Sequence, residues 1–504
     1  MKVVEMKNIT KRFPGIIANK NINFDLEKRE IHVLLGENGA GKTTLMNILY
    51  GIYTQDEGDI FINGSKIKIK NPKDAISNGI GMVHQHFMLV HNFTVMENIV
   101  LGCEPVKSGI IFDKKSAFKK VKEIIDKYEF NIDPEVKIED ISVGQQQKVE
   151  ILKILYRGAD IIILDEPTAV LIPSEIKELE IIMKNLTKEG KSIILITHKL
   201  KEVMSMSNRV TIIRRGELID NLNTKDTSID ELANLMVGRP VNLNVYKQGE
   251  NKLSKILEVK DLKAKDSRGV NVLKGVSFNV QSGEIFGIAG VAGNGQSELV
   301  EVITGIRKCY SGKIIFDGEN IENLTPREII DKKISSIPED RHKTGLILQH
   351  SLYENSILGM QNDKKFKKGM FLDYKSIRKH ALDIIEEFDV RTVSENVEAS
   401  KLSGGNQQKL IVGREIYKNP KLIIAVQPTR GLDIGAIEYI HKRLIKERDS
   451  GKAVLLISLE LDEVLGLSDR IGVMYDGNIV KVLDRCEFDE NKVGVLMAGG
   501  SIDG

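Results

Sequence analysis

Long stretches of this 504-residue sequence occur twice, and this duplication constrains the fold more than any other feature. GENGAGKTTLMNILYGIYTQDEG, from Gly36, matches GVAGNGQSELVEVITGIRKCYSG, from Gly290, at an offset of 254 residues. ISVGQQQK around Ser142 matches LSGGNQQK around Ser403 at an offset of 261 residues. A nearly constant offset over this length predicts a duplicated domain, because solenoid repeats have periods of roughly 20–50 residues.

Each copy combines strand and helix patterns. EIHVLL, DIIILD and KSIILITH are apolar at consecutive positions, which is typical of buried parallel strands. After Lys42, the residues Leu45, Ile48 and Leu49 recur three and four apart, as on one face of a helix. We therefore expect an α/β fold with two tandem domains, residues 1–240 and 256–504, and a polar linker at 241–255.

Bulk composition excludes several classes of protein. The net charge of +2 gives no sign of a nucleic-acid partner. The three cysteines are far apart and form no C-x-x-C pair, so we expect a reducing compartment and neither zinc site nor disulfide framework. The start MKVVEMKNITKRF lacks the apolar core of a secretory signal, and no apolar run approaches the ~18 residues that cross a bilayer.

The stretch GENGAGKT fits G-x-x-x-x-G-K-[ST] at every fixed position, after a strand-like run and before a helix. In such a phosphate loop, backbone N–H groups surround phosphate oxygens, the lysine reaches the β- and γ-phosphates and the hydroxyl ligates Mg²⁺. The sequence thus predicts an ATP site whose contacts are Gly36, Glu37, Asn38, Gly39, Ala40, Gly41, Lys42, Thr43 and Thr44.

An acidic pair ends the apolar run IIILD. Asp165 can hold Mg²⁺ through water, because this hard cation prefers oxygen ligands. Glu166 is the natural group to orient or activate the attacking water. A lone DE pair is more often part of an ordinary loop, but this pair follows a buried strand in a chain that also carries a phosphate loop.

Phosphate loop, SVGQQQ, LDEPT and THK, in this order and spacing, resemble the ATP-binding subunit of ABC transporters over nearly the whole chain, twice. The resemblance implies a RecA-like core and a helical subdomain in each domain. It implies that Phe13 stacks on adenine, that Gln85 senses Mg²⁺ and the membrane subunit, and that His198 contacts the γ-phosphate. A phenylalanine like Phe13 also fits a core position. The first signature loop departs from the usual LSGGQ, because Val143 stands at a glycine position.

The second copy has lost this chemistry. Gln296 stands at the lysine position, Val426 and Gln427 replace the acidic pair, and Leu459 replaces the histidine. LSGGN, with Ser403, Gly404 and Gly405, is intact. If the halves meet head-to-tail, as the family's domains do, these three residues complete the first copy's site. We expect one hydrolytic site and one that at most binds nucleotide; a second copy that is only a scaffold is the alternative.

Three classes of protein carry two fused domains of this kind. An importer's ATPase is favoured over a translation factor, which carries a long charged arm and acids in both halves, and over a repair ATPase, which has zinc modules or coiled coils. LSGGNQQK and PTRGLD resemble monosaccharide-type importers, and GIGMVHQHFMLV and AVQPTRGLDIGAIEYIH resemble their nucleoside branch, with ribose or galactose import as the alternative.

The resemblance also implies partners and a location. They are two integral membrane permease subunits and, through them, an extracytoplasmic lipoprotein that binds the solute, with peripheral association at the cytoplasmic face. Docking is expected beside Gln85, over residues 86–102, with Phe87 and Met88 at the surface. A simple core role for the run HFMLV is equally compatible with the sequence.

Overall fold

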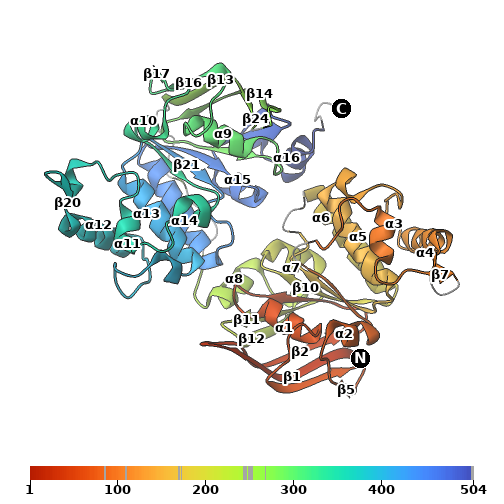
Figure 1. Cartoon of the computed structure of the whole chain (residues 1–504). Coiled ribbons are helices and arrows are strands. Elements are labelled where there is room, and N and C mark those ends of the chain that lie inside the picture. The colour runs from red at the N-terminus through yellow and green to blue at the C-terminus, as the bar shows by residue number, and fades with distance from the viewer. Residues whose placement is uncertain are drawn as a thin grey trace. The chain divides into compact units, whose positions relative to one another are not determined.

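The computed structural model describes residues 1–84, 87–107, 111–168, 171, 173–241, 247, 254–266 and 268–500. The chain forms two compact units, Met1–Val241 and Asn242–Gly504 (Figure 1). Each unit is described by itself below.

The first unit contains two sheets. An antiparallel sheet has the strand order β2-β1-β4-β5, and a six-stranded core sheet has the order β12-β11-β3-β10-β9-β6. In the core sheet only β12 runs antiparallel to its neighbour. The strands are β1 Lys2–Phe13, β2 Ile16–Glu27, β3 Ile31–Leu35, β4 Glu57–Ile62, β5 Ser65–Ile67, β6 Ile80–Val83, β9 Ile161–Asp165, β10 Ser192–Thr197, β11 Arg209–Arg214 and β12 Glu217–Asn223.

Helices connect these strands and cover the core sheet. The parallel order requires crossover connections, which the helices provide. They are α1 Lys42–Leu49, α2 Pro72–Ser77, α3 Val95–Val100, α4 Lys114–Lys127, α5 Val143–Tyr156, α6 Pro173–Lys188, α7 Leu200–Met206 and α8 Ile229–Val237.

The second unit repeats this topology. Its antiparallel sheet has the order β14-β13-β16-β17, and its core sheet has the order β18-β21-β22-β15-β23-β24. The strands are β13 Lys255–Lys265, β14 Asn271–Gln281, β15 Ile285–Ala289, β16 Ser311–Phe316, β17 Glu319–Asn320, β18 Ile334–Ile337, β21 Leu422–Val426, β22 Ala453–Ile457, β23 Arg470–Tyr475 and β24 Asn478–Asp484.

The helices of the second unit correspond to those of the first. They are α9 Gln296–Ile303, α10 Pro326–Asp331, α11 Leu352–Ser356, α12 Tyr374–Glu387, α13 Gly404–Tyr417, α14 Ile434–Asp449, α15 Leu461–Leu467 and α16 Glu490–Met497. Short 3₁₀ turns cover Ile138–Asp140, Thr224–Asp226, Lys364–Phe366, Ala399–Lys401 and Arg485–Glu487, and Arg341–Gly345 forms one π turn.

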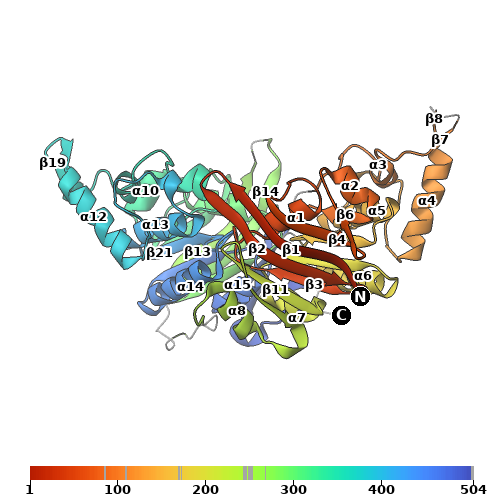
Figure 2. The same ribbon diagram turned by 90° about the horizontal axis from the view of Figure 1, so that it is seen from below.

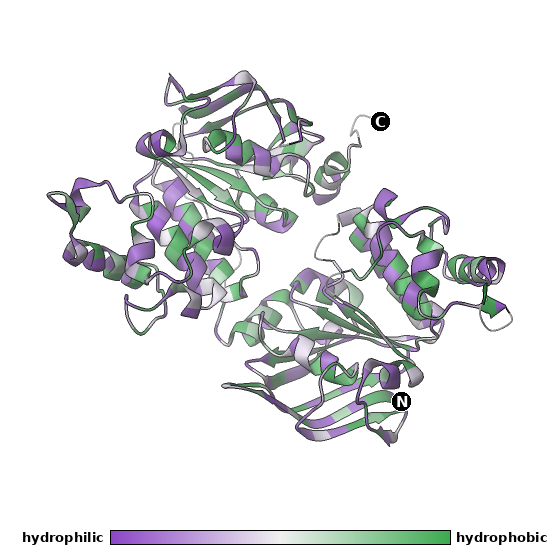
Figure 3. Ribbon diagram, viewed as in Figure 1, coloured by the Kyte–Doolittle hydropathy of each residue, from purple (hydrophilic) through white to green (hydrophobic). Residues whose placement is uncertain are grey.

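Burial explains why the central strands read as unbroken apolar runs. Every residue of β3, β9 and β10 is buried, as is every residue of β15, β21 and β22. These strands are predominantly green in the hydropathy view (Figure 3). In each unit one apolar cluster joins the two sheets and the helix that follows the first core strand, α1 or α9. This packing fixes the carboxyl ends of the core strands, where the candidate site lies.

Each unit also carries a short β-hairpin in its helical region, just before α4 or α12. The first hairpin consists of β7 Val106–Lys107 and β8 Ile111–Phe112, and the second of β19 Lys367–Lys368 and β20 Phe371–Leu372. In Figure 2 the second hairpin lies at the start of α12, away from the sheets of its own unit.

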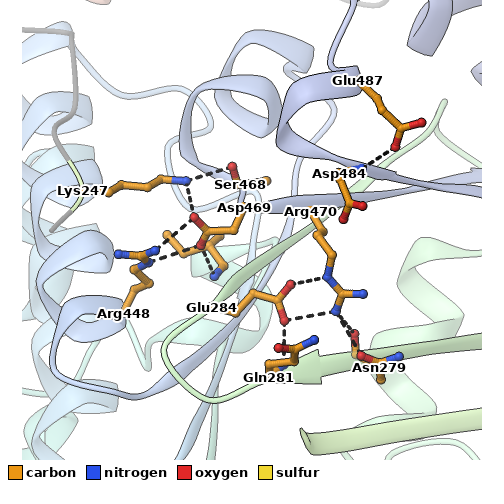
Figure 4. A network of polar contacts seen from close by, with 11 residues as sticks. Lys247, Asn279, Gln281, Glu284, Arg448, Ser468, Asp469, Arg470, Asp484 and Glu487 are labelled. Atoms are coloured by element: carbon orange, nitrogen blue, oxygen red, sulfur yellow. Dashed lines mark hydrogen bonds and ion pairs between the residues drawn. The ribbon is translucent and has the colours of Figure 1, made fainter. Parts of the chain in front are cut away.

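Lys247, inside the expected linker, is bound to the second unit (Figure 4). Its Nζ donates to the Ser468 carbonyl at 2.8 Å and pairs with Asp469 at 2.9 Å. Arg448 contacts the same carboxylate at 3.2 Å. Burial lowers the pKa of Lys247, and the Asp469 carboxylate opposes this shift. Lys247 therefore anchors the linker to the second unit.

None of the helices in the described part of the chain has both the length and the apolar character needed to span a bilayer.

Candidate functional site

The phosphate loop of the first unit leads from β3 into α1 through two glycines that no other residue can replace without strain. Gly41 has φ 101°, a conformation that L side chains rarely adopt. A Cβ at Gly41 would lie 2.3 Å from the Ala18 carbonyl oxygen, and one at Gly36 would lie 2.3 Å from that of Ile213. The side chain of the buried Asn19 donates to the Gly41 carbonyl at 3.0 Å and fixes the loop from β2. The result is a rigid backbone cradle ahead of a helix N-terminus.

Lys42, the first residue of α1, is folded back over this loop. Its Nζ donates to the carbonyls of Gly36 at 2.8 Å and Glu37 at 2.9 Å. Burial lowers the pKa of Lys42, while the carboxylates of Glu166 and Asp165 oppose that shift. A buried cation that faces main-chain oxygens and two carboxylates fits a role as a phosphate ligand.

Asp165 ends β9, beside the phosphate loop. Its neighbour across the sheet is Ile196 of β10, whose other flank is β3. Burial raises the pKa of Asp165 to about 6, helped by the Glu166 carboxylate and opposed by a hydrogen bond from the Thr43 side chain. Thr43 is exposed and Asp165 buried, so a hydroxyl and a carboxylate oxygen face each other at the mouth of the loop. Oxygen donors of this kind fit Mg²⁺.

Glu166 takes a left-handed backbone conformation, with φ 48°. This is unusual for a residue with a side chain and is a feature that clusters at functional sites. Its amide donates to the Ile196 carbonyl at 2.9 Å. The turn thereby directs the carboxylate toward His198, whose Nδ1 lies 2.9 Å from Glu166 Oε1. The His198 hydrogen bond lowers the pKa of Glu166 against its burial, so the carboxylate is held ionised.

The buried carboxylate of Glu202, which the sequence did not single out, links the turn after β9 to the end of β10. Glu202 accepts hydrogen bonds from Thr168 and, at 2.8 Å, from Thr197. Thr197 Oγ1 also accepts from the Lys199 amide at 3.0 Å. Burial raises the pKa of Glu202. A signal was available, because the second copy has Thr429 and Glu463 at the same offset of 261 residues, and these also form a hydrogen bond, of 2.7 Å.

The remaining expected nucleotide contacts differ in burial and in the element that carries them. Phe13 ends β1, is half-buried and packs edge-on against Tyr53 with ring centroids 5.4 Å apart. Thr44 lies on α1 and is half-buried. Asn38 and Gly39 are exposed at the tip of the phosphate loop, whereas Ala40 is buried. Gln85 lies outside the described residues.

The expected docking stretch is mixed in character. Met88 is 65% exposed, its amide donates to Glu150 at 2.7 Å, and Phe87 is half-buried. Leu89 is buried, so part of this run is core.

The intact signature loop of the second unit is the N-terminus of α13. Ser403 is the N-cap residue and accepts a hydrogen bond from the Asn406 side chain at 2.9 Å. A Cβ at Gly404 would come within 2.9 Å of the Arg341 guanidinium, and one at Gly405 within 3.3 Å of Ala436. The three small residues keep this helix end accessible to an anion.

The second unit keeps the backbone of the nucleotide loop but not its charges. Gln296 is buried at the lysine position, and its amide donates to the Val291 carbonyl at 3.0 Å. Ser297 donates to Glu339 at 3.3 Å, and Arg430 contacts that carboxylate at 3.0 Å. No group equivalent to the Glu166–His198 pair remains, because Gln427 and Leu459 occupy those positions.

Comparison with known proteins decides the family. Residues 19–169 and 273–430 match the family described as ABC transporter, once in each unit. The chain belongs to the ABC transporter family. It carries the ATP-binding cassette of this family twice, and the expected fold and nucleotide binding are confirmed. ATP hydrolysis coupled to import, the expected activity, is the activity of its relatives in this family.

Three curated relatives align with nearly the whole chain. The nucleoside import ATP-binding protein NupA of Lactococcus lactis is 54% identical over 99% of each chain. The guanosine import ATP-binding protein NupO of Bacillus subtilis is 55% identical over 99% of this chain and 98% of its own. The glucose import ATP-binding protein TsgD13 of Haloferax volcanii is 44% identical over 99% and 96%.

One solved structure shares the fold over most of the chain. The complex of archaeal ribosomal stalk protein aP1 with the ribosome recycling factor aABCE1 aligns with a TM-score of 0.63, over 95% of this chain and 90% of that chain. The identity is 17%, so the likeness concerns the fold alone.

Proposed function

We propose that this chain is the ATP-hydrolysing subunit of an importer for nucleosides. The observation that carries the proposal is the end-to-end identity of 54% and 55% with a nucleoside and a guanosine import ATP-binding protein. The side chains around the first phosphate loop support the chemistry, because they are the ones that phosphoryl transfer to water requires.

In this proposal the residues of the first unit divide the work. Lys42 and the loop amides bind the phosphates, and Phe13 supports the adenine ring. Thr43, Asp165 and Gln85 hold Mg²⁺, which when bound neutralises phosphate charge. Glu166 accepts a hydrogen bond from the attacking water and orients it, and His198 holds the Glu166 carboxylate in place at 2.9 Å and contacts the γ-phosphate. Catalysis of this kind depends on positioning and electrostatics.

We propose unequal roles for the two units. The first hydrolyses ATP, and the second contributes Ser403, Gly404 and Gly405 to a competent site when ATP is bound, within one chain or between two chains. The loop at Gln296 at most binds nucleotide. Closure of the signature loop on ATP and its release after hydrolysis would give the conformational cycle that drives import.

The proposed partners are two integral membrane permease subunits and, through them, an extracytoplasmic lipoprotein that binds the solute. The chain would act as a peripheral protein at the cytoplasmic face of the membrane. The exposed Met88 and its neighbours from residue 86 to residue 102 are the proposed permease contact.

The experiment is uptake into vesicles reconstituted with the permease, the binding protein and this chain. When ATP is supplied in the compartment that contains this subunit, labelled uridine and guanosine should accumulate in that compartment. Labelled ribose and glucose should not accumulate. The matched control replaces Glu166 by Gln, which keeps the shape of the side chain and removes the charge. Accumulation of ribose or glucose without nucleoside uptake would replace the proposal by sugar import, which the 44% identity to a glucose import protein favours as second candidate.

A further inference from the structure

The β19–β20 hairpin of the second unit exposes apolar side chains at its tip. Met370 is 96% exposed and Phe371 is 79% exposed, and Leu372 and Tyr374 beside them are also exposed. In Figure 1 this hairpin lies at the outer edge of the second unit, beyond the start of α12. Since the tip adds nothing to the core, its apolar surface needs another explanation.

The base of the hairpin is firmly built into the fold. Phe366 is buried in a small apolar cluster with Ile357, Met360 and Ile377. Its carbonyl accepts a hydrogen bond from the Asp373 amide at 2.8 Å, which closes the hairpin. Gly369, with φ 66°, makes the turn at the tip. The tip is therefore presented on a fixed base.

Positive charge surrounds this tip. Residues 364–379 contain seven Lys or Arg residues and one acid, Asp373. Asp373 caps α12 and accepts hydrogen bonds from the Lys375 and Ser376 amides and, at 2.7 Å, from the Ser376 hydroxyl. The lysines are exposed; they are Lys364, Lys365, Lys367, Lys368, Lys375 and Lys379.

The first unit has the same arrangement at the same place. Val106, Ile111 and Phe112 of its hairpin are exposed. Asp113 caps the next helix, and residues 114–122 carry five lysines, all exposed, and no acid.

We propose that these hairpins bind an anionic phospholipid bilayer directly, with Met370 and Phe371 entering the headgroup boundary and the lysines facing lipid phosphates. Apolar and aromatic tips with basic flanks partition in this way, and juxtamembrane lysines are attracted to anionic lipid. A protein partner fits less well, because lysine is depleted from the cores of protein interfaces. The proposal goes beyond the importer function, since it depends neither on ATP hydrolysis nor on the solute.

The absence of tryptophan from the sequence provides a clean test. Phe371→Trp introduces a single fluorescent reporter into the full chain, and Ile306→Trp, at a 69% exposed position near α9, is the matched control. With vesicles of phosphatidylcholine and phosphatidylglycerol, emission at position 371 should shift to shorter wavelength and be shielded from acrylamide. Vesicles of phosphatidylcholine alone, and the Ile306→Trp control, should give no shift.

Sedimentation with the same vesicles measures the strength of binding. Lys367→Gln with Lys368→Gln should weaken partitioning roughly 30-fold, from the contribution of two lysines near the surface. Added salt should weaken it further. ATP hydrolysis in solution should stay normal in these variants, which separates this test from the proposed function. The proposal would be overturned by equal emission shifts at both tryptophans or by binding only to vesicles that contain permease. It would also be overturned if the double variant Met370→Ser/Phe371→Ser partitioned onto vesicles as the wild type does.

Discussion

Gly41 and Gly295 precede the first helix of each unit with φ angles of 101° and 104°. Glu166 and Gln427 both have φ 48°, and their amides donate to the next strand at 2.9 and 2.7 Å. The Gln296 side chain even repeats the hydrogen bond of Lys42, to the carbonyl five residues earlier. The two loops thus share one backbone, and they differ in the charges it carries. Packing fixes the shape of a nucleotide loop, whereas a few side chains decide whether it can do chemistry.

The largest effect should come from the lysine position. Lys42→Ala removes the buried ammonium group that lies against the phosphate loop. Steady-state ATP hydrolysis should fall about 1,000-fold, as when a main electrostatic contact is lost. Gln296→Ala is the matched change in the second unit and should leave hydrolysis within about twofold. Similar losses for both variants would mean that the units work alike.

The histidine position should have a smaller effect. His198→Ala removes the hydrogen bond that keeps Glu166 ionised and oriented, and turnover should fall roughly 100-fold. Leu459→Ala, at the corresponding exposed position, serves as the control and should change little. Rapid turnover in His198→Ala would show that Glu166 is positioned by other contacts.

A buried position below the loops should distinguish the units by pH. Burial lowers the pKa of His32 to about 4, and Phe286 occupies the same position of the second unit. The unfolded chain therefore binds more protons between pH 6.5 and 4. The free energy of unfolding of the region around β3 should therefore be highest above about pH 6.5. It should fall by about 3 kcal/mol as the pH is lowered from 6.5 to 4.

The second unit suggests the variant that removes this pH dependence. Phe286 stacks on Phe278, and Gly472 leaves room for its ring. The ring of His32 packs at a tilt of 36° against Phe24, and its Nε2 forms a hydrogen bond with the Thr211 hydroxyl at 2.8 Å. In the double variant His32→Phe/Thr211→Gly, the β3 amides should no longer lose protection against hydrogen exchange as the pH is lowered. The β15 amides should keep the protection that they have in the wild type. An unchanged acid response would assign it to another group.

The smallest effect concerns the linker. Asp469 corresponds to Asn208 of the first unit. Each accepts a hydrogen bond from the first amide of the neighbouring core strand, β15 or β3. Asp469→Asn can keep that hydrogen bond but loses the charge that pairs with Lys247 and Arg448. The free energy of unfolding should fall by about 1 kcal/mol. Limited proteolysis should cut the linker faster in this variant. Asn208→Asp, the reverse change in the first unit, is the comparison.

Much of this architecture could be predicted, because strong local patterns produced it. The buried strands show as apolar runs, and GENGAGKT determines a loop and the start of α1 within one motif. Other features depend on contacts that are distant in sequence. Glu202 looks like any helix residue until Thr168 and Thr197 are placed against it. The hairpin tips at Ile111 and Phe371 resemble core residues in composition, and only the fold leaves them exposed.

The most direct measurement compares ATP hydrolysis in two variants of the full chain, Glu166→Gln and Gln427→Ala. With a single hydrolytic unit, Glu166→Gln should lose about 1,000-fold of its turnover, as expected when the group that orients water is neutralised. Gln427→Ala should hydrolyse ATP at nearly the normal rate, because its side chain carries no charge to lose. If Glu166→Gln kept about half of the activity and Gln427→Ala lost the other half, both units would be catalytic and the asymmetry would be refuted.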